Sequence, residues 1–290
     1  MKLAALYTGE GERTSLHLLV GEKYVAVDRL VDEGSHLRGL ADVGALFALG
    51  DEALEELRLL EAAAAEVDGA TEVRLAPPVT RPSKIVCVGL NYLAHIEETN
   101  NVKPERIVLF SKYPSSLVGD GAEVRRPAIT SKLDYEGELA VVIGRRTRAV
   151  SVADALSAIG GFTIINDVSA RDLQSAEGQW VRGKALDTFA PLGPVVLDAA
   201  SVPEIGDLRI VTHVNGEVRQ NDLCSLMITP VAELISYISA YITLEPGDII
   251  ATGTPQGVAS GMDTPVYLEP GDEMSVTIEE IGVLHSRVTG

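Results

Sequence analysis

The sequence predicts a β-rich α+β fold, with a small N-terminal α+β domain (residues 1–75) ahead of a larger body (residues 76–290). Three observations support this prediction. Short apolar runs alternate with Gly-containing turns over residues 2–30, as in an antiparallel meander, and a helical pattern follows over residues 42–67. A proline-rich connector at residues 75–82 then separates these elements from a body that ends in about a hundred mostly strand-like residues.

The body opens with a strand pattern at residues 84–89, and residues 90–98 are suited to a helix. A second strand follows at residues 108–112. The continuous apolar run at residues 139–143 is typical of a buried strand.

The last part of the chain carries further strand patterns. Residues 208–214 lead into an Asn215-Gly216 pair, which favours a hairpin turn. An amphipathic helix is expected at residues 230–242, before strands that begin near residues 248 and 274.

Charge and composition exclude several classes of partner and site. The net charge of −18 argues against nucleic acid or an anionic membrane surface, because like charges repel at long range. No apolar run approaches the roughly 18 residues of a membrane span, and the start lacks a signal-peptide pattern, so a cytoplasmic location is expected. Cys87 and Cys224 are isolated and are expected in the core, not in a disulfide or a thiolate metal site.

Two carboxylates stand two residues apart at the start of the apolar run. If Glu136 and Glu138 belong to the strand, both side chains lie on one face, with Cα atoms about 6.5 Å apart. Asp167 follows another strand pattern and is a candidate third ligand. Three carboxylates at one place cannot all stay ionised without a cation. Oxygen ligands favour Mg²⁺, Mn²⁺ or Ca²⁺ over zinc, and three of them leave an open site.

The same acids have a simpler interpretation, which their spacing alone leaves open. Glu136 and Glu138 could be the solvated side of an edge strand. Asp167 could be the N-cap of a following helix.

Other polar residues are candidates for catalysis or binding. His95 and Glu98 would share a helix face, and a carboxylate beside an imidazole makes a general base; a surface His–Glu pair is the alternative. Lys112 ends a strand and could meet an anion or be solvated. Lys184 lies in an irregular Gly- and Pro-punctuated segment that suggests an active-site wall. Thr254 lies in a small-residue turn that could hold a carboxylate.

Five separated motifs together resemble the fumarylacetoacetate hydrolase superfamily, in order, over about residues 82–290. The motifs are Val88-Gly89-Leu90-Asn91-Tyr92 with His95 and Glu98, Tyr135-Glu136-Gly137-Glu138, Asn166-Asp167 through Arg171-Asp172-Leu173-Gln174, Gly183-Lys184, and Thr252-Gly253-Thr254-Pro255.

The resemblance implies a mixed β-sandwich roll and assigns roles to these residues. By it, Glu136, Glu138 and Asp167 are the Mg²⁺ or Mn²⁺ ligands. His95 and Glu98 activate water, Lys184 is the cation beside the metal, and Arg171, Lys112 and Thr254 contact substrate. The family also implies a homodimer.

The implied function is hydrolysis of a C–C bond in a 3-acylpyruvate-type 2-oxo acid, such as a fumarylpyruvate, through a metal-stabilised enolate. The alternatives are a 2-hydroxyhepta-2,4-diene-1,7-dioate isomerase or an oxaloacetate decarboxylase on the same site. Leu90 stands where the family more often has Arg, and residues 99–105 follow no assigned pattern, which leaves the substrate open.

The sequence disfavours two other classes of protein. A non-catalytic metal-binding scaffold is disfavoured by the presence of His95, Glu98 and Lys184. A nucleotide-binding enzyme is disfavoured because no Gly-x-Gly-x-x-Gly or phosphate-loop pattern occurs.

Overall fold

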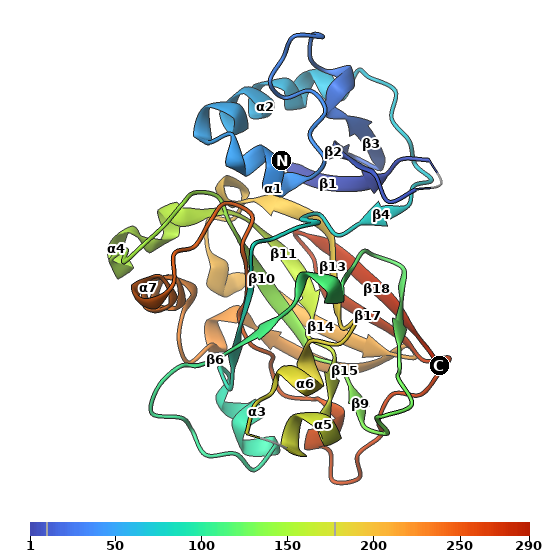
Figure 1. Ribbon diagram of the computed structural model, residues 1–290, viewed down its shortest axis with the longest axis vertical. Helices are drawn as coiled ribbons and strands as arrows, with labels where there is room; N and C mark the ends of the chain where they lie inside the picture. Colours follow the sequence, from blue (N-terminus) through green and yellow to red (C-terminus); the bar gives the residue numbers. More distant parts are fainter. Residues whose placement is uncertain (10, 177) are drawn as a thin grey trace.

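The structure, a computed structural model, describes residues 1–9, 11–176 and 178–290. Figure 1 shows a β-rich body below a smaller N-terminal layer of strands and helices. The predicted strand-rich α+β class is confirmed. No helix among these residues has the length and apolar character needed to cross a membrane.

The main sheet, as far as the described residues show it, has eleven strands and contains both N-terminal and body segments. The predicted meander is confirmed as three antiparallel strands at its edge. The central path runs β3 (Lys23–Ala26), β2 (Thr14–Val20), β1 (Lys2–Tyr7), β13 (Ala190–Asp198), β11 (Ile159–Asn166), β10 (Gly137–Ile143), β16 (Ile249–Ala251), β5 (Ile85–Gly89), β6 (Val108–Lys112), with β4 (Leu75–Ala76) on β1 and β7 (Leu117–Val118) on β13.

A second sheet packs across the strands β10, β11 and β13. The Asn215-Gly216 hairpin predicted from sequence joins two of its strands. In order, the described strands of this sheet are β15 (Glu217–Leu223), β14 (Arg209–Val214), β17 (Glu273–Ile278), β18 (Gly282–Thr289) and β8 (Ala122–Arg125), and a separate ribbon pairs β9 (Leu133–Asp134) with β12 (Ser169–Ala170).

Helices cover the remaining faces. The helical pattern over residues 42–67 is split in two, because Gly50 takes a φ of 93°, which interrupts the helix. Asp42 caps the first half by accepting a hydrogen bond from the Ala45 amide at 2.9 Å. The described helices are α1 (Val43–Ala48), α2 (Asp51–Ala64), α3 (Leu93–Glu98), α4 (Val152–Ala155), α5 (Arg171–Ala176), α6 (Val181–Lys184) and α7 (Val231–Tyr241).

Strand β10 is buried on both faces, which explains its unbroken apolar sequence. Leu139 and Val141 pack into the core between the two sheets and α7, whereas Ala140 and Val142 pack into the core beneath α1 and α2. Successive residues of a strand face opposite sides, so the two cores alternate along it.

The N-terminal strands share the main sheet with the body, since Leu3 of β1 pairs with Val196 of β13. The division at residue 75 stays a prediction.

Four strand ends meet at one side of the main sheet. The start of β10 lies opposite the end of β11, with Gly137 paired to Asn166. Strand β16 is antiparallel to β10 and parallel to β5, so the ends of β16 and β5 reach the same side. Residues that follow these ends, or precede β10, are therefore brought together.

Gly137 allows the close approach of the two sheets at this point. A methyl carbon added there would overlap Thr212 Oγ1 and lie 2.9 Å from Val276 Cγ1.

We expect Gly137→Ala to lower the free energy of unfolding by about 1–3 kcal/mol through overpacking, measured by urea denaturation. Gly34→Ala, where an added carbon meets nothing within 4 Å, is the control. Equal stability of the two variants would contradict the sheet packing described.

Candidate active site

The three predicted metal ligands lie together where the strand ends meet. Glu136 immediately precedes β10, Glu138 lies within it, and Asp167 follows β11. All three are buried, and each offers an oxygen within 4.8 Å of the others. Backbone hydrogen bonds fix the arrangement: the Asp167 amide donates to the Glu136 carbonyl at 2.8 Å, and Asn166 Oδ1 accepts from the Glu136 amide at 3.0 Å.

The simpler interpretation of these acids is therefore wrong. Strand β10 lies between β11 and β16 and not at a sheet edge. Asp167 leads into β12 and does not cap a helix. Its side chain has no exposed surface and contacts two lysines instead.

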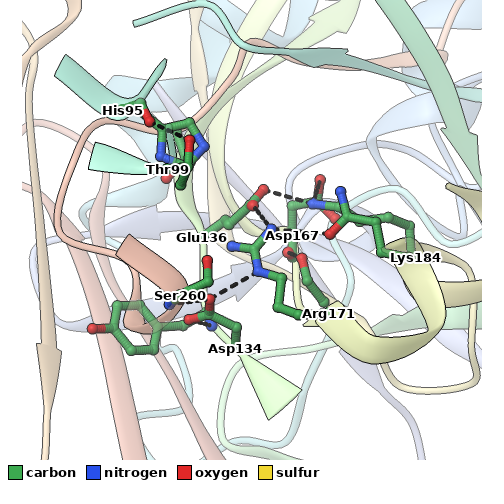
Figure 2. A network of polar contacts seen from close by, with 12 residues as sticks. His95, Thr99, Asp134, Glu136, Asp167, Arg171, Lys184 and Ser260 are labelled. Carbon is green, nitrogen blue, oxygen red and sulfur yellow. Dashed lines mark hydrogen bonds and ion pairs between the residues drawn. The ribbon is translucent and has the colours of Figure 1, made fainter. Parts of the chain in front are cut away.

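Three basic side chains contact the carboxylates, and Figure 2 shows two of them, Lys184 and Arg171. Lys184 Nζ lies 2.6 Å from Glu136 Oε2 and 2.9 Å from Asp167 Oδ2. Arg171 Nη1 lies 2.6 Å from Glu136 Oε1, and its Nε donates to Asp134 Oδ2 at 2.8 Å. Lys184 and Arg171 thus each bridge two acids.

Lys112 is buried behind Asp167. Its Nζ lies 2.6 Å from Asp167 Oδ1 and also donates to the Val168 carbonyl at 3.0 Å and to the Lys184 carbonyl. Sequence reasoning proposed Lys112 as a substrate contact. In the structure Lys112 is buried, does not line the cavity described below, and contacts the acid cluster through Asp167.

The pKa values of Glu138 and Glu136 are shifted in opposite directions. Burial and the neighbouring Asp167 and Glu136 raise the pKa of Glu138 well above its ordinary value. For Glu136, burial also acts to raise the pKa, but Lys184 and Arg171 outweigh it and hold the pKa below its ordinary value.

The pKa values of Lys184 and Lys112 are also shifted in opposite directions. Burial acts to lower the pKa of Lys184, but Asp167 and Glu136 more than offset this and raise it. The pKa of Lys112 is lowered, because burial exceeds the attraction of Asp167.

The cluster has an excess of negative charge without a cation. Its four acids and three bases carry one net negative charge when all are ionised. The acids are Asp134, Glu136, Glu138 and Asp167, and the bases are Lys112, Arg171 and Lys184.

The residues present fit a hard divalent cation. The donor set consists of carboxylate oxygens, which suit Mg²⁺, Mn²⁺ or Ca²⁺. Burial, and then repulsion by Asp167 and Glu136, raise the pKa of Glu138, and a bound cation would favour its ionised form against both. Glu136, Glu138 and Asp167 would hold it.

A cavity of about 330 Å³ opens over this cluster. Six of the predicted site residues line it, whereas Asp167, Lys112 and Glu98 do not. The six are His95, Glu136, Glu138, Arg171, Lys184 and Thr254.

His95 and Glu98 form the predicted pair on α3, with His95 Nδ1 2.8 Å from Glu98 Oε1. The other oxygen, Glu98 Oε2, accepts from the Gly257 amide at 2.8 Å. Because a carboxylate only accepts hydrogen bonds, Nδ1 carries the proton, and Nε2 of the neutral ring is left as a proton acceptor.

The loop after β16 binds acids of the protein itself. The Gly253 amide donates to Glu138 Oε2 at 2.8 Å. The Thr254 hydroxyl donates to the Gly137 carbonyl at 3.0 Å and accepts from Gln220 Nε2 at 2.8 Å. The turn predicted to hold a substrate carboxylate thus holds Glu138. A substrate contact by Thr254 stays a prediction.

The irregular segment around Lys184 does form a wall of the cavity, as expected. Trp180 lies against Gly89, where an added methyl carbon would overlap its ring, and packs edge-on against Phe110. Lys184 Nζ lies 5.1 Å from the centre of the Phe110 ring.

Several residues in or next to the cavity were not predicted from the sequence. Lys132 and Tyr267 line the cavity, as does Ser260, whose backbone amide binds Asp134. Asp134 precedes the Tyr135-Glu136 motif, and that adjacency was the only available signal for it. Ser260 and Tyr267 lie in stretches without a motif.

The fold and site define a β-rich protein with a buried carboxylate cluster at the floor of a cavity. The family model described as "Fumarylacetoacetate (FAA) hydrolase C-terminal" matches residues 84–289. The chain belongs to this family, and the resemblance drawn from its motifs is confirmed.

One relative and two solved structures that are similar to this chain carry the names of three different enzymes. Oxaloacetate tautomerase FAHD2A, mitochondrial, of Homo sapiens is 43% identical over 241 residues, which are 82% of this chain and 77% of that protein. The structure of fumarylacetoacetate hydrolase from Exiguobacterium antarcticum superposes with a TM-score of 0.84 at 36% identity, over 100% of this chain and 99% of that one. The structure of 2-hydroxyhepta-2,4-diene-1,7-dioate isomerase from Mycobacterium marinum gives 0.74 at 35% identity, over 100% and 98%.

Divalent cations are expected to stabilise the protein through the three carboxylates. At a concentration about 100 times its Kd, Mg²⁺ or Mn²⁺ would add about 2.7 kcal/mol to the free energy of unfolding and raise Tm. Glu138→Gln should abolish the shift, whereas Glu123→Gln, at an exposed position on β8, should keep it. An unchanged shift in Glu138→Gln would exclude this residue as a ligand.

Proposed function

We propose that the protein is a divalent-cation-dependent enzyme that interconverts the keto and enol forms of a 2-oxo dicarboxylic acid, such as oxaloacetate. The observation that carries the proposal is the position of His95, which lies in one cavity with Glu136 and Glu138. A proton acceptor and a cation site thus face the same space. The name of the human relative, oxaloacetate tautomerase, supports the choice of reaction.

The 2-oxo acid end of the substrate would lie over the acid cluster. A divalent cation bound there would act as a Lewis acid toward substrate oxygens. Lys184 and Arg171 hold the two oxygens of the Glu136 carboxylate from two sides. With the cation, the ionised cluster would carry one net positive charge, which suits one substrate carboxylate.

His95 would transfer the proton. In the direction from keto to enol, Nε2 would take a proton from C3 and give that proton to the oxygen on C2, so that the ring ends neutral again. The reverse direction would move the proton from that oxygen back to C3. No electrons are exchanged. Glu98 stabilises the charged imidazole, and the Gly257 amide keeps Glu98 oriented toward the ring.

Lys132 would meet the second carboxylate of the substrate. It lines the cavity, and within the described residues no carboxylate lies in ion-pair contact with it. Its Nζ lies 5.9 Å from the centre of the Tyr267 ring. This cation can therefore bind an incoming anion without first breaking an ion pair.

Hydrolysis of a 3-acylpyruvate is the second candidate. The same His95–Glu98 pair could activate water, and fumarylacetoacetate hydrolase from Exiguobacterium antarcticum shares the fold along the whole chain. Decarboxylation of oxaloacetate would use the cation site and dispense with the base.

A substrate panel separates these reactions. Wild-type enzyme with Mg²⁺ would be given oxaloacetate, acetylpyruvate, fumarylpyruvate and a hydroxymuconate-type dienoate, with enol absorbance, CO₂ release and product formation followed in parallel. The proposal expects the highest kcat/KM for keto–enol interconversion of oxaloacetate. Faster cleavage of an acylpyruvate would establish hydrolysis instead.

His95→Gln and Glu98→Gln should each lower kcat for interconversion by about 10²–10⁴, because a general base or its partner is lost. Glu97→Gln, an exposed neighbour on α3, is the matched control and should keep wild-type kcat. Metal-dependent stabilisation should persist in all three variants. Full activity in His95→Gln would refute its role as the base.

Lys132→Gln should raise KM for oxaloacetate by about 3- to 10-fold, the usual value of a partly exposed charge contact, with little change in kcat. KM for acetylpyruvate, which has one carboxylate, should not change. The measurement is steady-state kinetics with both substrates. An equal rise in both KM values would contradict a contact with the second carboxylate.

A further inference from the structure

Asp134 is a buried carboxylate that lies outside the cavity wall and outside the proposed metal ligands, yet it accepts four hydrogen bonds. Oδ1 accepts from the Tyr135 amide at 2.9 Å and from the Ala259 amide at 2.8 Å. Oδ2 accepts from the Ser260 amide at 3.0 Å and from Arg171 Nε at 2.8 Å. Figure 2 shows Asp134 beside Ser260 and Arg171.

The first consequence concerns Arg171. Its guanidinium is held between Asp134 and Glu136, and these two carboxylates fix the plane of the group. Its remaining terminal nitrogen, Nη2, is buried and has no hydrogen-bond partner within the described part of the chain. Nη1 also donates to Gln174 Oε1 at 3.1 Å. Three side chains therefore orient the group, and only Glu136 among them belongs to the proposed metal site.

The second consequence concerns the loop that follows β16. Residues 259–261 form a single 3-10 turn, η7 (Ala259–Gly261), and its first two amides bind Asp134. Two residues earlier, the Gly257 amide binds Glu98. A Cβ on Gly257 would overlap the Arg219 carbonyl, so this part of the loop has little freedom to move. Asp134 therefore anchors the loop that orients Glu98.

We propose that Asp134 is a positioning residue, which holds Arg171 and the loop of Gly257 to Ser260 in a fixed relation on two sides of the catalytic cavity. This inference rests on the proposed function. Asp134 does not touch substrate. It aligns the guanidinium that faces Glu136 and, through the loop, the carboxylate that orients His95.

Asp134→Asn is the test variant. Asparagine keeps an acceptor oxygen for the Ala259 amide but loses the charge and the second oxygen, which accepts from both the Ser260 amide and Arg171 Nε. Asp172→Asn is the matched control. Asp172 is the next residue after Arg171 and also accepts from a hydroxyl and backbone amides, with Thr130 Oγ1 at 2.5 Å and the Ser131 amide at 2.9 Å. Within the described residues, its side chain makes no hydrogen bond or ion pair with Arg171 and does not line the cavity.

The kinetic readout uses oxaloacetate at a temperature where circular dichroism shows every variant folded. We expect kcat of Asp134→Asn to fall about 10- to 100-fold, the scale of a misoriented catalytic group, while Asp172→Asn stays near wild type. In an Arg171→Ala background, Asp134→Asn should lower kcat by a smaller factor than in wild type, because the part of its effect that acts through Arg171 is already lost. Losses that multiply in the double variant would overturn the proposal.

A second readout does not depend on turnover. In protein labelled with ¹⁵N-arginine, the Nε–H signal of Arg171 should be protected from exchange with water in wild type and Asp172→Asn. In Asp134→Asn it should exchange at least about tenfold faster. Unchanged protection would overturn the proposal. If wild type interconverts no 2-oxo acid, the proposed function fails, and this signal still decides whether Asp134 positions Arg171.

Discussion

The site depends on the cost of placing four carboxylates inside the protein. Asp134 and Asp167 have no exposed surface, and an unpaired ion in such a place is strongly unfavourable. Lys184, Lys112 and Arg171 each lie against one or two of these acids, and together they offset all but one negative charge. A divalent cation would more than offset the remaining charge and leave one net positive charge for a substrate carboxylate.

The sheet makes this cluster possible, because it brings together segments that are far apart in sequence. The antiparallel register of β10 and β11 pairs Gly137 with Asn166 and so sets Glu136 beside Asp167, with Glu138 two residues further along the strand. The parallel pairing of β5 with β16 brings α3 and the loop after β16 to the same side of the sheet. The two buried faces of β10 anchor the strand. A strand packed on both faces has little freedom to shift its register, which keeps the acids in place.

The local elements and the acid trio could be predicted from sequence. The apolar run after Glu138 indicates a buried strand, and period-two spacing puts Glu136 and Glu138 on one face. The grouping of those acids with Asp167, however, came from the family motifs, because spacing alone also allowed an exposed edge strand.

Backbone hydrogen bonds and pairings across the fold could not be predicted in this way. The amides of Gly253 and Gly257 bind Glu138 and Glu98, but an amide has no sequence signature. Lys112 was expected at the substrate, yet it is buried against Asp167, and no pattern in the sequence shows which lysine will be buried. The split at Gly50 was likewise missed because the helical periodicity continues across it.

The most direct test of the central claim is the location of a bound cation. In crystals grown with Mn²⁺, anomalous scattering marks the metal independently of any activity. We expect an anomalous-scattering peak about 2.0–2.3 Å from one oxygen each of Glu136, Glu138 and Asp167, with Lys184 close by. A fully occupied Mn²⁺ bound elsewhere, with these three carboxylates still paired only to lysine and arginine, would contradict it.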